Sequence, residues 1–465
     1  MFITKKLFLV KITGVFILET LQQIVTTISN FIWSYVLIIL LCGTGIYFTL
    51  KLRFVQIRKF GAGIKSVFGG FSLNGERANK DGMSSFQSLT TAIASQVGTG
   101  NITGAAVAIA SGGPGSVFWM WVSAFLGMAT IYAEATLAQK YKKRIDGEIT
   151  GGPVYYIREA YKGKFGKFLA TFFSIAIIIA LGFTGNMVQA NSIGSSFNEA
   201  FGVSPLVVGI VIAIMAAFIF LGGADRIASV TEKLVPIMAL FYITGSLIII
   251  FLNFGSLGTA FKQIFILAFK PQAIAGGVAG VTIKNAIYYG MSKGLFSNEA
   301  GMGSTPHAHA RAKVDHPCDQ GIVAIIGVFN TFIILTLTSL VIITTGSVST
   351  GLSATPLAQY AFSTTFGSFG NIFIAICMLF FAFSTIIGWY FFGEVNVKYL
   401  FGNKAVKIYS ALVVVAIVIG STLNVDFVWS LSDMFNGLMV IPNLLGVLAL
   451  SKIVSELTKE HDKRK

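Results

Sequence analysis

Two glycine-rich, polar runs interrupt otherwise apolar segments of this chain, and both carry groups that could bind ions or a charged small molecule. In the first, residues 95–101, Gly98 and Gly100 flank Thr99. The second, residues 294–304, reads Gly-Leu-Phe-Ser-Asn-Glu-Ala-Gly-Met-Gly-Ser. Glycine weakens a helix and leaves backbone groups uncovered, so both runs can unwind. Freed carbonyls can then coordinate a cation, while freed N–H groups at the start of a half-helix attract an anion.

The elements that position these runs are expected to lie in a membrane. Of the 465 residues, 54% are hydrophobic and 11% charged, whereas about a quarter of the residues in an ordinary soluble domain are charged. Apolar runs near the roughly 20 residues that cross a bilayer as a helix recur along the chain. We therefore expect an all-α integral membrane protein with about eleven transmembrane helices, at residues 31–50, 84–110, 115–139, 167–189, 205–221, 230–254, 275–300, 318–346, 367–395, 405–423 and 427–450.

The basic residues predict the orientation of these helices. Most of the 34 Lys and Arg residues follow odd-numbered spans or lie in the C-terminal tail at 451–465, which predicts a multi-pass plasma-membrane protein with a cytoplasmic C-terminus. The net charge of +15 therefore does not indicate a nucleic-acid partner. We expect residues 1–30 to form an N-terminal interfacial segment, because Lys11 and Glu19 suit a lipid-facing span poorly. A twelfth span at 7–27 is the alternative.

The two interruptions are related in a way that indicates transport. They lie five spans apart, and because five is odd, a repeat with that offset must be inverted in the membrane. Paired interrupted helices in inverted repeats indicate a secondary transporter with a site near the membrane midplane. The expected organisation is an extra helix at 31–50, followed by five-helix repeats at 84–254 and 275–450. In isolation, a small-residue stripe for helix packing explains the first run equally well.

Three longer motifs resemble the alanine or glycine:cation symporter family. They are residues 98–105 (Gly-Thr-Gly-Asn-Ile-Thr-Gly-Ala), 151–157 (Gly-Gly-Pro-Val-Tyr-Tyr-Ile) and 296–304 (Phe-Ser-Asn-Glu-Ala-Gly-Met-Gly-Ser). The likeness extends over essentially the whole chain from about residue 30. It implies a LeuT-type core of two inverted five-helix repeats, and sodium-driven uptake of alanine, with glycine or D-alanine also expected. Some family members favour glutamine, so glutamine is an alternative substrate.

The resemblance also implies a sodium site at the first interruption. The carbonyls of Ala94 and Val97 would face the co-transported ion, and Ser384 and Thr385 in the ninth span would supply hydroxyls. Sodium prefers oxygen ligands, so these groups suffice without a formal charge. The ordinary alternative is that both hydroxyls bond to the backbone of their own helix.

The same resemblance assigns the substrate contacts. The backbone N–H groups of Thr99 and Gly100 would hold the substrate carboxylate, and backbone carbonyls near Phe296, Ser297 and Asn298 would meet its ammonium group. A second sodium beside Gln96 and Asn101 is an alternative use of those two side chains. The remaining candidates around the substrate are Gln96, Asn101, Phe183, Thr184, Asn186, Met187, Gln189 and Trp389. For the aromatic residues, plain helix packing is an equal alternative.

Glu134 and Glu299 are the carboxylates expected at membrane depth, where a charge is costly and function is the default hypothesis. We expect Glu299 to form a structural or gating ion pair with Lys284 or Lys293. The alternative makes Glu299 a proton carrier, which would give proton rather than sodium coupling.

The chain offers little for catalysis. His307, His309, His316 and Cys318 form the metal-like cluster of the sequence, but histidines two apart on a helix point to different faces. No nucleophile motif, phosphate-binding loop or dinucleotide fingerprint stands in a supporting context. We therefore expect neither an enzyme nor a metal site beyond sodium. A passive channel is the remaining alternative, and the sequence lacks the charged or filter-forming rings that would support it.

Overall fold

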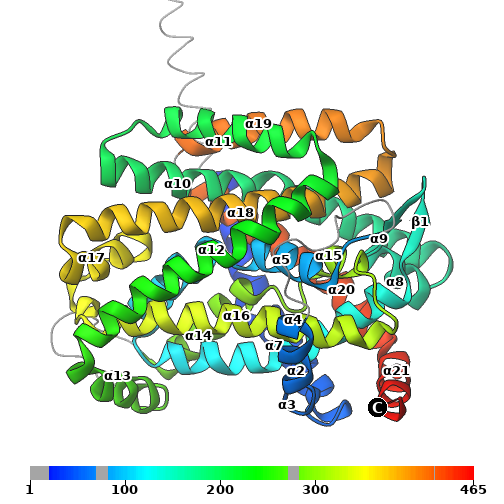
Figure 1. The fold of residues 1–465 in the computed structure, drawn as a ribbon, viewed down its shortest axis with the longest axis horizontal. Helices are drawn as coiled ribbons and strands as arrows, with labels where there is room; N and C mark the ends of the chain where they lie inside the picture. Colours follow the sequence, from blue (N-terminus) through cyan, green and yellow to red (C-terminus); the bar gives the residue numbers. More distant parts are fainter. Residues whose placement is uncertain (1–19, 70–81, 271–281, 424, 465) are drawn as a thin grey trace, which may run out of the picture.

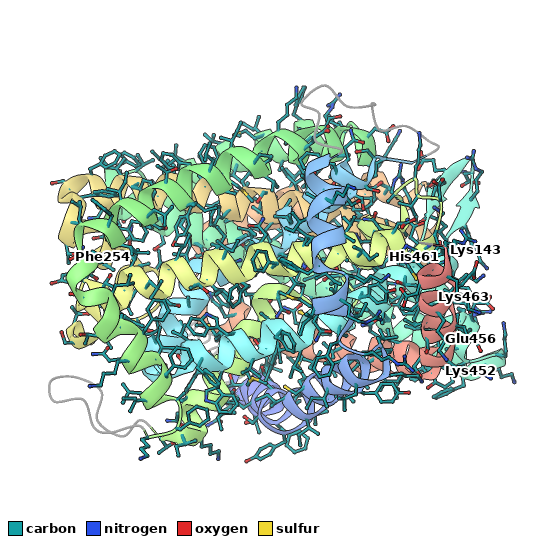
Figure 2. All side chains as sticks on the ribbon, turned by 60° about the horizontal axis from the view of Figure 1, so that its bottom comes forward. Lys143, Phe254, Lys452, Glu456, His461 and Lys463 are labelled. Carbon is teal, nitrogen blue, oxygen red and sulfur yellow. The ribbon has the colours of Figure 1, made fainter. Side chains whose placement is uncertain are left out.

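The computed structural model describes residues 20–69, 82–270, 282–423 and 425–464. The long helices run roughly side by side across Figure 1, with α8, β1 and α21 at one end of the molecule and α13 and α17 at the other. Figure 2 shows Lys143, Lys452 and Lys463 at the first end and Phe254 at the opposite one. Among the described residues, eight helices are long and apolar enough to cross a membrane.

The first half of the chain contains the first interrupted helix and a small hairpin. A continuous helix, Thr20–Lys51, opens the described part and includes η1 and α2. The elements are η1 (Ile32–Leu37), α2 (Ile38–Lys51), α3 (Val55–Arg58), α4 (Phe60–Gly69), α5 (Ser85–Gln96), η2 (Gly100–Gly104), α6 (Ala105–Gly112), α7 (Ser116–Lys140), β1 (Lys143–Ile145), β2 (Glu148–Thr150), α8 (Pro153–Ala160), α9 (Gly163–Ile177), η3 (Ile178–Gly185), α10 (Asn186–Phe201), α11 (Pro205–Phe220), α12 (Gly223–Leu252) and α13 (Phe254–Leu267).

The second half contains the second interrupted helix and ends in a short amphipathic helix. Its elements are α14 (Ile283–Asn298), α15 (Pro306–Ala310), α16 (Pro317–Thr344), η4 (Ser347–Thr350), α17 (Ala354–Phe366), α18 (Ser368–Phe401), α19 (Ala405–Thr422), α20 (Val425–Ala449) and α21 (Ser451–Lys463). β1 and β2 pair antiparallel, and Arg144 lies opposite Ile149.

Over its described residues, each predicted span coincides with a helix or with an interrupted helix of the structure; residues 275–281 lie outside the described part. The spans at 84–110 and 275–300 are the interrupted ones: the first break lies between α5 and η2, and the second follows α14. One expectation differs: residues 20–30 continue into the first long helix instead of forming a separate interfacial segment. No glycine or proline stands between Thr20 and Cys42 to end the helix there. Residues 1–19 lie outside the described part.

The two interrupted helices are joined to each other. Met83, just before α5, forms a parallel β-bridge with Ala312, just after α15. Its N–H donates to the Arg311 carbonyl over 3.0 Å, and its carbonyl accepts from the Lys313 N–H over 3.0 Å. Further in, the Ser88 hydroxyl donates to the Ala308 carbonyl over 3.0 Å. α5 and α15 therefore lie side by side, as Figure 1 shows, and the two breaks are held at similar depth.

Candidate functional site

The first break lies directly after α5. The helix begins with a capping box of Ser84 and Gln87 and ends at Gln96, because Val97 leaves the helical conformation with φ −95° and ψ 72°. The next regular hydrogen bonding belongs to η2, which starts at Gly100. Residues 97–99 therefore carry backbone groups that no continuous helix covers. The interruption predicted from Gly98 and Gly100 is confirmed.

Two hydroxyls from α18 contact the C-terminal end of α5. Ser384 Oγ and Thr385 Oγ1 each lie within hydrogen-bond distance of the Ala94 carbonyl, at 3.2 and 3.0 Å. Each also bonds to the Phe381 carbonyl of its own helix, at 2.8 and 3.0 Å, as the ordinary alternative predicted. Gly98 brings the backbone against the same side chain, because a Cβ added there would stand 2.4 Å from Thr385 Oγ1. All of these residues are fully buried, as is Val97. Ala94, Ser384 and Thr385, three of the four residues predicted as sodium ligands, thus bring carbonyl and hydroxyl oxygens together in one buried cluster, the donor set a hard cation prefers.

Gln189 on α10 forms hydrogen bonds with Thr99 in the first break. The Thr99 N–H donates to Gln189 Oε1 over 3.3 Å, and Gln189 Nε2 donates back to Thr99 Oγ1 over 3.1 Å. One of the two N–H groups expected to receive a carboxylate thus already faces a side-chain oxygen.

Among the described residues, several buried polar atoms on the helices that carry the two breaks lack a protein partner. Gln96 Nε2 donates to the Asn298 carbonyl over 2.8 Å, and Asn101 Nδ2 donates to the Gln96 carbonyl over 2.6 Å. The opposite ends of these amides, Gln96 Oε1 and Asn101 Oδ1, have no hydrogen-bond partner, and neither do Ser297 Oγ and Asn298 Nδ2. A buried orphan polar group costs about 1–3 kcal/mol and calls for an explanation. A polar or charged ligand between the breaks would supply the missing partners.

The second break is shaped by positive backbone angles. α14 ends at Asn298, and Glu299 adopts the left-handed conformation with φ 54°, followed by Gly301 and Gly303 with φ 85° and 79°. Glycine takes such angles without the penalty that a Cβ brings, whereas Glu299 must be held there by its contacts.

Those contacts are three hydrogen-bond donors around the Glu299 carboxylate. Trp389 Nε1 donates to Oε1 over 2.7 Å, while Ser304 Oγ and Ser95 Oγ donate to Oε2 over 2.5 and 3.1 Å. The expected ion pair is wrong: among the described residues, neither Lys284 nor Lys293 forms a salt bridge with Glu299. Lys284 is exposed near the start of α14. The physical reason is that uncharged donors from α5, from α18 and from the loop before α15 already surround the Glu299 carboxylate.

Glu134 on α7 holds the other side of the second break. Its carboxylate accepts from the N–H groups of Gly301 and Gly303 over 2.8 and 3.1 Å, and from Asn443 Nδ2 on α20 over 2.6 Å. Asn443 Nδ2 also donates to the Gly301 carbonyl over 2.9 Å. Sequence reasoning singled out Glu134 but missed Asn443, whose only signal is an amide in a mostly apolar helix.

Comparisons with known proteins show the family to which the chain belongs. The sequence profile of the Sodium:alanine symporter family matches residues 18–465. The chain belongs to this family. It is 41% identical over 444 residues to the sodium/alanine symporter AgcS of Methanococcus maripaludis, covering 94% of this chain and 96% of that one. It is 38% identical over 452 residues to the probable sodium/glutamine symporter GlnT of Bacillus subtilis, with 96% and 92% covered.

The fold is also found among solved structures. A manganese transporter from Eremococcus coleocola superposes with a TM-score of 0.51 at 14% identity, covering 79% of this chain and 76% of that one. This likeness concerns the fold alone, which is the LeuT-type arrangement expected from the sequence. As a member of the sodium:alanine symporter family, the protein is a transporter and not an enzyme.

Two aromatic residues that the family resemblance suggested for the substrate border the breaks. An added Cβ on Gly100 would meet the Phe296 ring at 3.4 Å, so Phe296 covers the first break. An added Cβ on Gly185 would stand 2.6 Å from Trp389 Cζ3, which places this indole between α18 and the end of η3.

Phe183 and Met187 lie elsewhere. Phe183 packs edge-on against Tyr409 of α19, with ring centroids 5.6 Å apart, and an added Cβ on Gly420 of α19 would stand 2.5 Å from Met187 Cα. The structure brings neither residue to the breaks, and the α10 side chain that reaches Thr99 is Gln189.

The histidines serve the fold around α15 and α16. His307 Nε2 meets Asn396 Nδ2 at 2.9 Å, and His309 Nδ1 meets Gln320 Nε2 at 2.8 Å. His316 caps α16 through a 3.2 Å bond from the Cys318 N–H. Within the described residues, no three His, Cys, Asp or Glu side chains lie close enough to hold a metal ion.

Proposed function

We propose that this member of the sodium:alanine symporter family couples sodium entry to the uptake of small neutral amino acids. Alanine is the first candidate, and glycine and D-alanine are the next. The observation that carries the proposal is the buried meeting of the α5 end with Ser384 and Thr385. It supplies oxygen ligands for a cation beside backbone N–H groups that suit a carboxylate.

Sodium would bind between α5 and α18. The carbonyls of Ala94 and Val97 and the hydroxyls of Ser384 and Thr385 are the proposed ligands. In the present arrangement the two hydroxyls lie within hydrogen-bond distance of the Ala94 carbonyl. A cation at this place would turn their lone pairs toward itself, so that all four oxygens point to one centre. Gln96 Oε1 and Asn101 Oδ1, which lack partners, are proposed to face the substrate or a second sodium.

The amino acid would bind across both breaks. Its carboxylate would take the place of Gln189 Oε1 at the Thr99 N–H and reach the N–H of Gly100. Its ammonium group would meet carbonyls of Phe296, Ser297 and Asn298 at the end of α14. Phe296 and Trp389 would restrict the side chain, which favours alanine over larger residues.

Coupling follows because ion and substrate share one unwound segment. Sodium at Ala94 and Val97 orders the backbone that carries the Thr99 and Gly100 N–H groups, so each ligand tightens binding of the other by an equal factor. The two interrupted helices would then rock together against the rest of the bundle. We place the end that carries α21 in the cytoplasm, since the basic loops gather there.

Two alternatives have specific support. Glutamine as substrate is favoured by the likeness to a probable sodium/glutamine symporter. Proton coupling through Glu299 would use a carboxylate that is fully enclosed by Trp389, Ser304 and Ser95. The oxygens of Ala94, Ser384 and Thr385, by contrast, suit a cation without any titrating group. Sodium coupling is therefore the proposal.

The test is uptake of labelled alanine into proteoliposomes under an inward sodium gradient, with potassium in its place as the comparison. We expect accumulation with sodium only, and its loss in Thr385→Ala. Thr344→Ala on α16 is the matched control, since the Thr344 hydroxyl bonds to its own helix at Leu340 and Val341. Uptake driven equally well by a proton gradient in potassium would reject sodium coupling. Flux that never exceeds equilibrium would indicate a channel.

A further inference from the structure

Two adjoining cavities lie just outside the breaks. Their volumes are about 390 Å³ and about 210 Å³, and both are bordered by Val107, Lys293, Phe296 and Asp433. The larger one also reaches Ala354 and Thr355 at the start of α17, which lies at the end of the molecule opposite α21 (Figure 1). We call the two together the outer vestibule.

Lys293 and Asp433 are the charged side chains among the residues that line the outer vestibule. They come from α14 and α20, and both are half-buried. Within the described part of the chain neither forms a salt bridge, with each other or with a third residue. The backbone at Asp433 is fixed, because its carbonyl accepts from Trp33 Nε1 over 2.9 Å. Lys293 acts on the Asp433 carboxylate only through the space between them, so one positive and one negative group face a shared cavity without a direct ion pair.

The vestibule leads to the proposed central site. Lys293 precedes Phe296 by three residues, so both lie on one face of α14. Phe296 borders the vestibule and also covers Gly100 of the first break. On the facing helix, Gly100, Gly104 and Val107 line the larger cavity at helical spacing. A molecule held between Lys293 and Asp433 would therefore stand one helical turn outside the central site, on the way in.

We infer that the outer vestibule is a second, weaker binding position for a zwitterionic amino acid, with Lys293 facing its carboxylate and Asp433 its ammonium group. This inference rests on the proposed function. A zwitterion fits because it presents both charges a few ångströms apart and leaves neither side chain unpaired, whereas a simple anion or cation satisfies only one. The neutral hydroxyls and amide around the larger cavity, from Thr103, Asn191, Ser192 and Ser195, add hydrogen bonds without adding net charge.

The test is equilibrium binding of labelled alanine to the full-length purified protein in sodium, followed up to millimolar concentrations. We expect two components in the wild type, a tight one and a weak one, each approaching one alanine per chain. Lys293→Gln and Asp433→Asn should each lose the weak component and retain the tight one, which also shows that the variants are folded. Glycine should displace the weak component, while propionate and ethylamine, which carry one charge each, should not.

Matched controls come from the same end of the molecule. Lys284→Gln removes a positive charge from an exposed residue of α14, and Glu199→Gln removes a negative charge from an exposed residue of α10. Neither residue lines the vestibule, so both variants should keep two components. Saturation of the wild type at one alanine, or a weak component that survives Lys293→Gln and Asp433→Asn, overturns the inference while the proposed function stands. No sodium-dependent alanine binding by the wild type overturns both.

Discussion

The proposed sodium site depends on the missing side chain of Gly98. Because an added Cβ would stand 2.4 Å from Thr385 Oγ1, a methyl group there must push α18 away from the end of α5. The hydroxyls of Ser384 and Thr385 would then lose their position opposite the Ala94 carbonyl. A single methyl group thus separates the oxygens that a cation needs at short distance.

We predict that Gly98→Ala raises the sodium concentration for half-maximal alanine uptake at least about tenfold, equivalent to about 1.4 kcal/mol of lost binding. A sodium titration of uptake at fixed alanine measures this. Gly43→Ala is the control, because nothing lies within 4 Å of an added Cβ at Gly43, and its titration should match the wild type. An unchanged sodium dependence in Gly98→Ala would place the ion elsewhere.

At the scale of the elements, side chains from two helices, α7 and α20, hydrogen-bond to the backbone of the second break and keep it from continuing as a helix. We call this pair, Glu134 and Asn443, the clamp. Glu134 of α7 binds the N–H groups of Gly301 and Gly303, and Asn443 of α20 ties the same carboxylate to the Gly301 carbonyl. Without these partners the backbone polar groups after α14 would be buried and unsatisfied, which membrane segments do not tolerate.

We predict that Glu134→Gln destabilises the protein by about 1–3 kcal/mol, because the new amide NH₂ group faces backbone N–H donors where the carboxylate accepted them. Thermal unfolding in detergent should show a lower midpoint, and alanine uptake should fall with it. Glu159→Gln, which removes a surface carboxylate paired with Lys162, should leave the midpoint near that of the wild type. Equal midpoints for the two variants would show that Glu134 is not a clamp.

The interruptions themselves could be predicted, because glycine and polar residues in an apolar run leave a local signal at Gly98 and Gly301. The predicted meeting of Ala94 with Ser384 and Thr385 came from the family resemblance and is confirmed as a contact. Gln189 was among the candidates around the substrate, but its bond to Thr99 could not be assigned, and Asn443 was missed, since contacts between distant helices leave no local pattern. Phe183 and Met187, which the resemblance suggested beside the substrate, contact Tyr409 and Gly420 of α19 in the structure.

The largest-scale feature is the docking of α21 across the end of the bundle that carries the basic loops. Asp462 of α21 forms ion pairs with Lys59 and with Arg58, the latter at 3.3 Å. His461 Nε2 of the same helix lies 2.9 Å from Asp319 Oδ1 at the start of α16. The hydroxyls of Thr458 and Tyr132 lie 3.0 Å apart. Cys318 is fully buried beside this contact. α21 therefore covers the start of α16, and its release would expose a thiol that labelling can detect.

Charge contributes to that docking in a definite pH range. Burial raises the pKa of Asp462, but Lys59 and Arg58 outweigh it and hold this pKa below its usual value. The carboxylate therefore stabilises the docked helix above the pKa it has when undocked, and this contribution is lost as the pH falls through its lowered pKa. At neutral pH the ion pairs of Asp462 are fully present. An uncharged residue at position 462 should therefore weaken the docking of α21 in the same way as protonation of Asp462 at low pH.

We predict that Asp462→Asn at pH 7 increases maleimide labelling of Cys318 roughly fivefold, since a partly exposed pair contributes up to about 1 kcal/mol to docking. A background with Cys42→Ser and Cys377→Ser leaves Cys318 as the one thiol of the three in the chain. Glu456→Gln is the matched control, because this exposed residue of α21 pairs only with exposed Lys452 at 4.0 Å. Its labelling rate should equal that of the background. If Asp462→Asn also labelled at the background rate, the ion pairs would not hold α21 in place, and the apolar face of the helix would account for its docking alone.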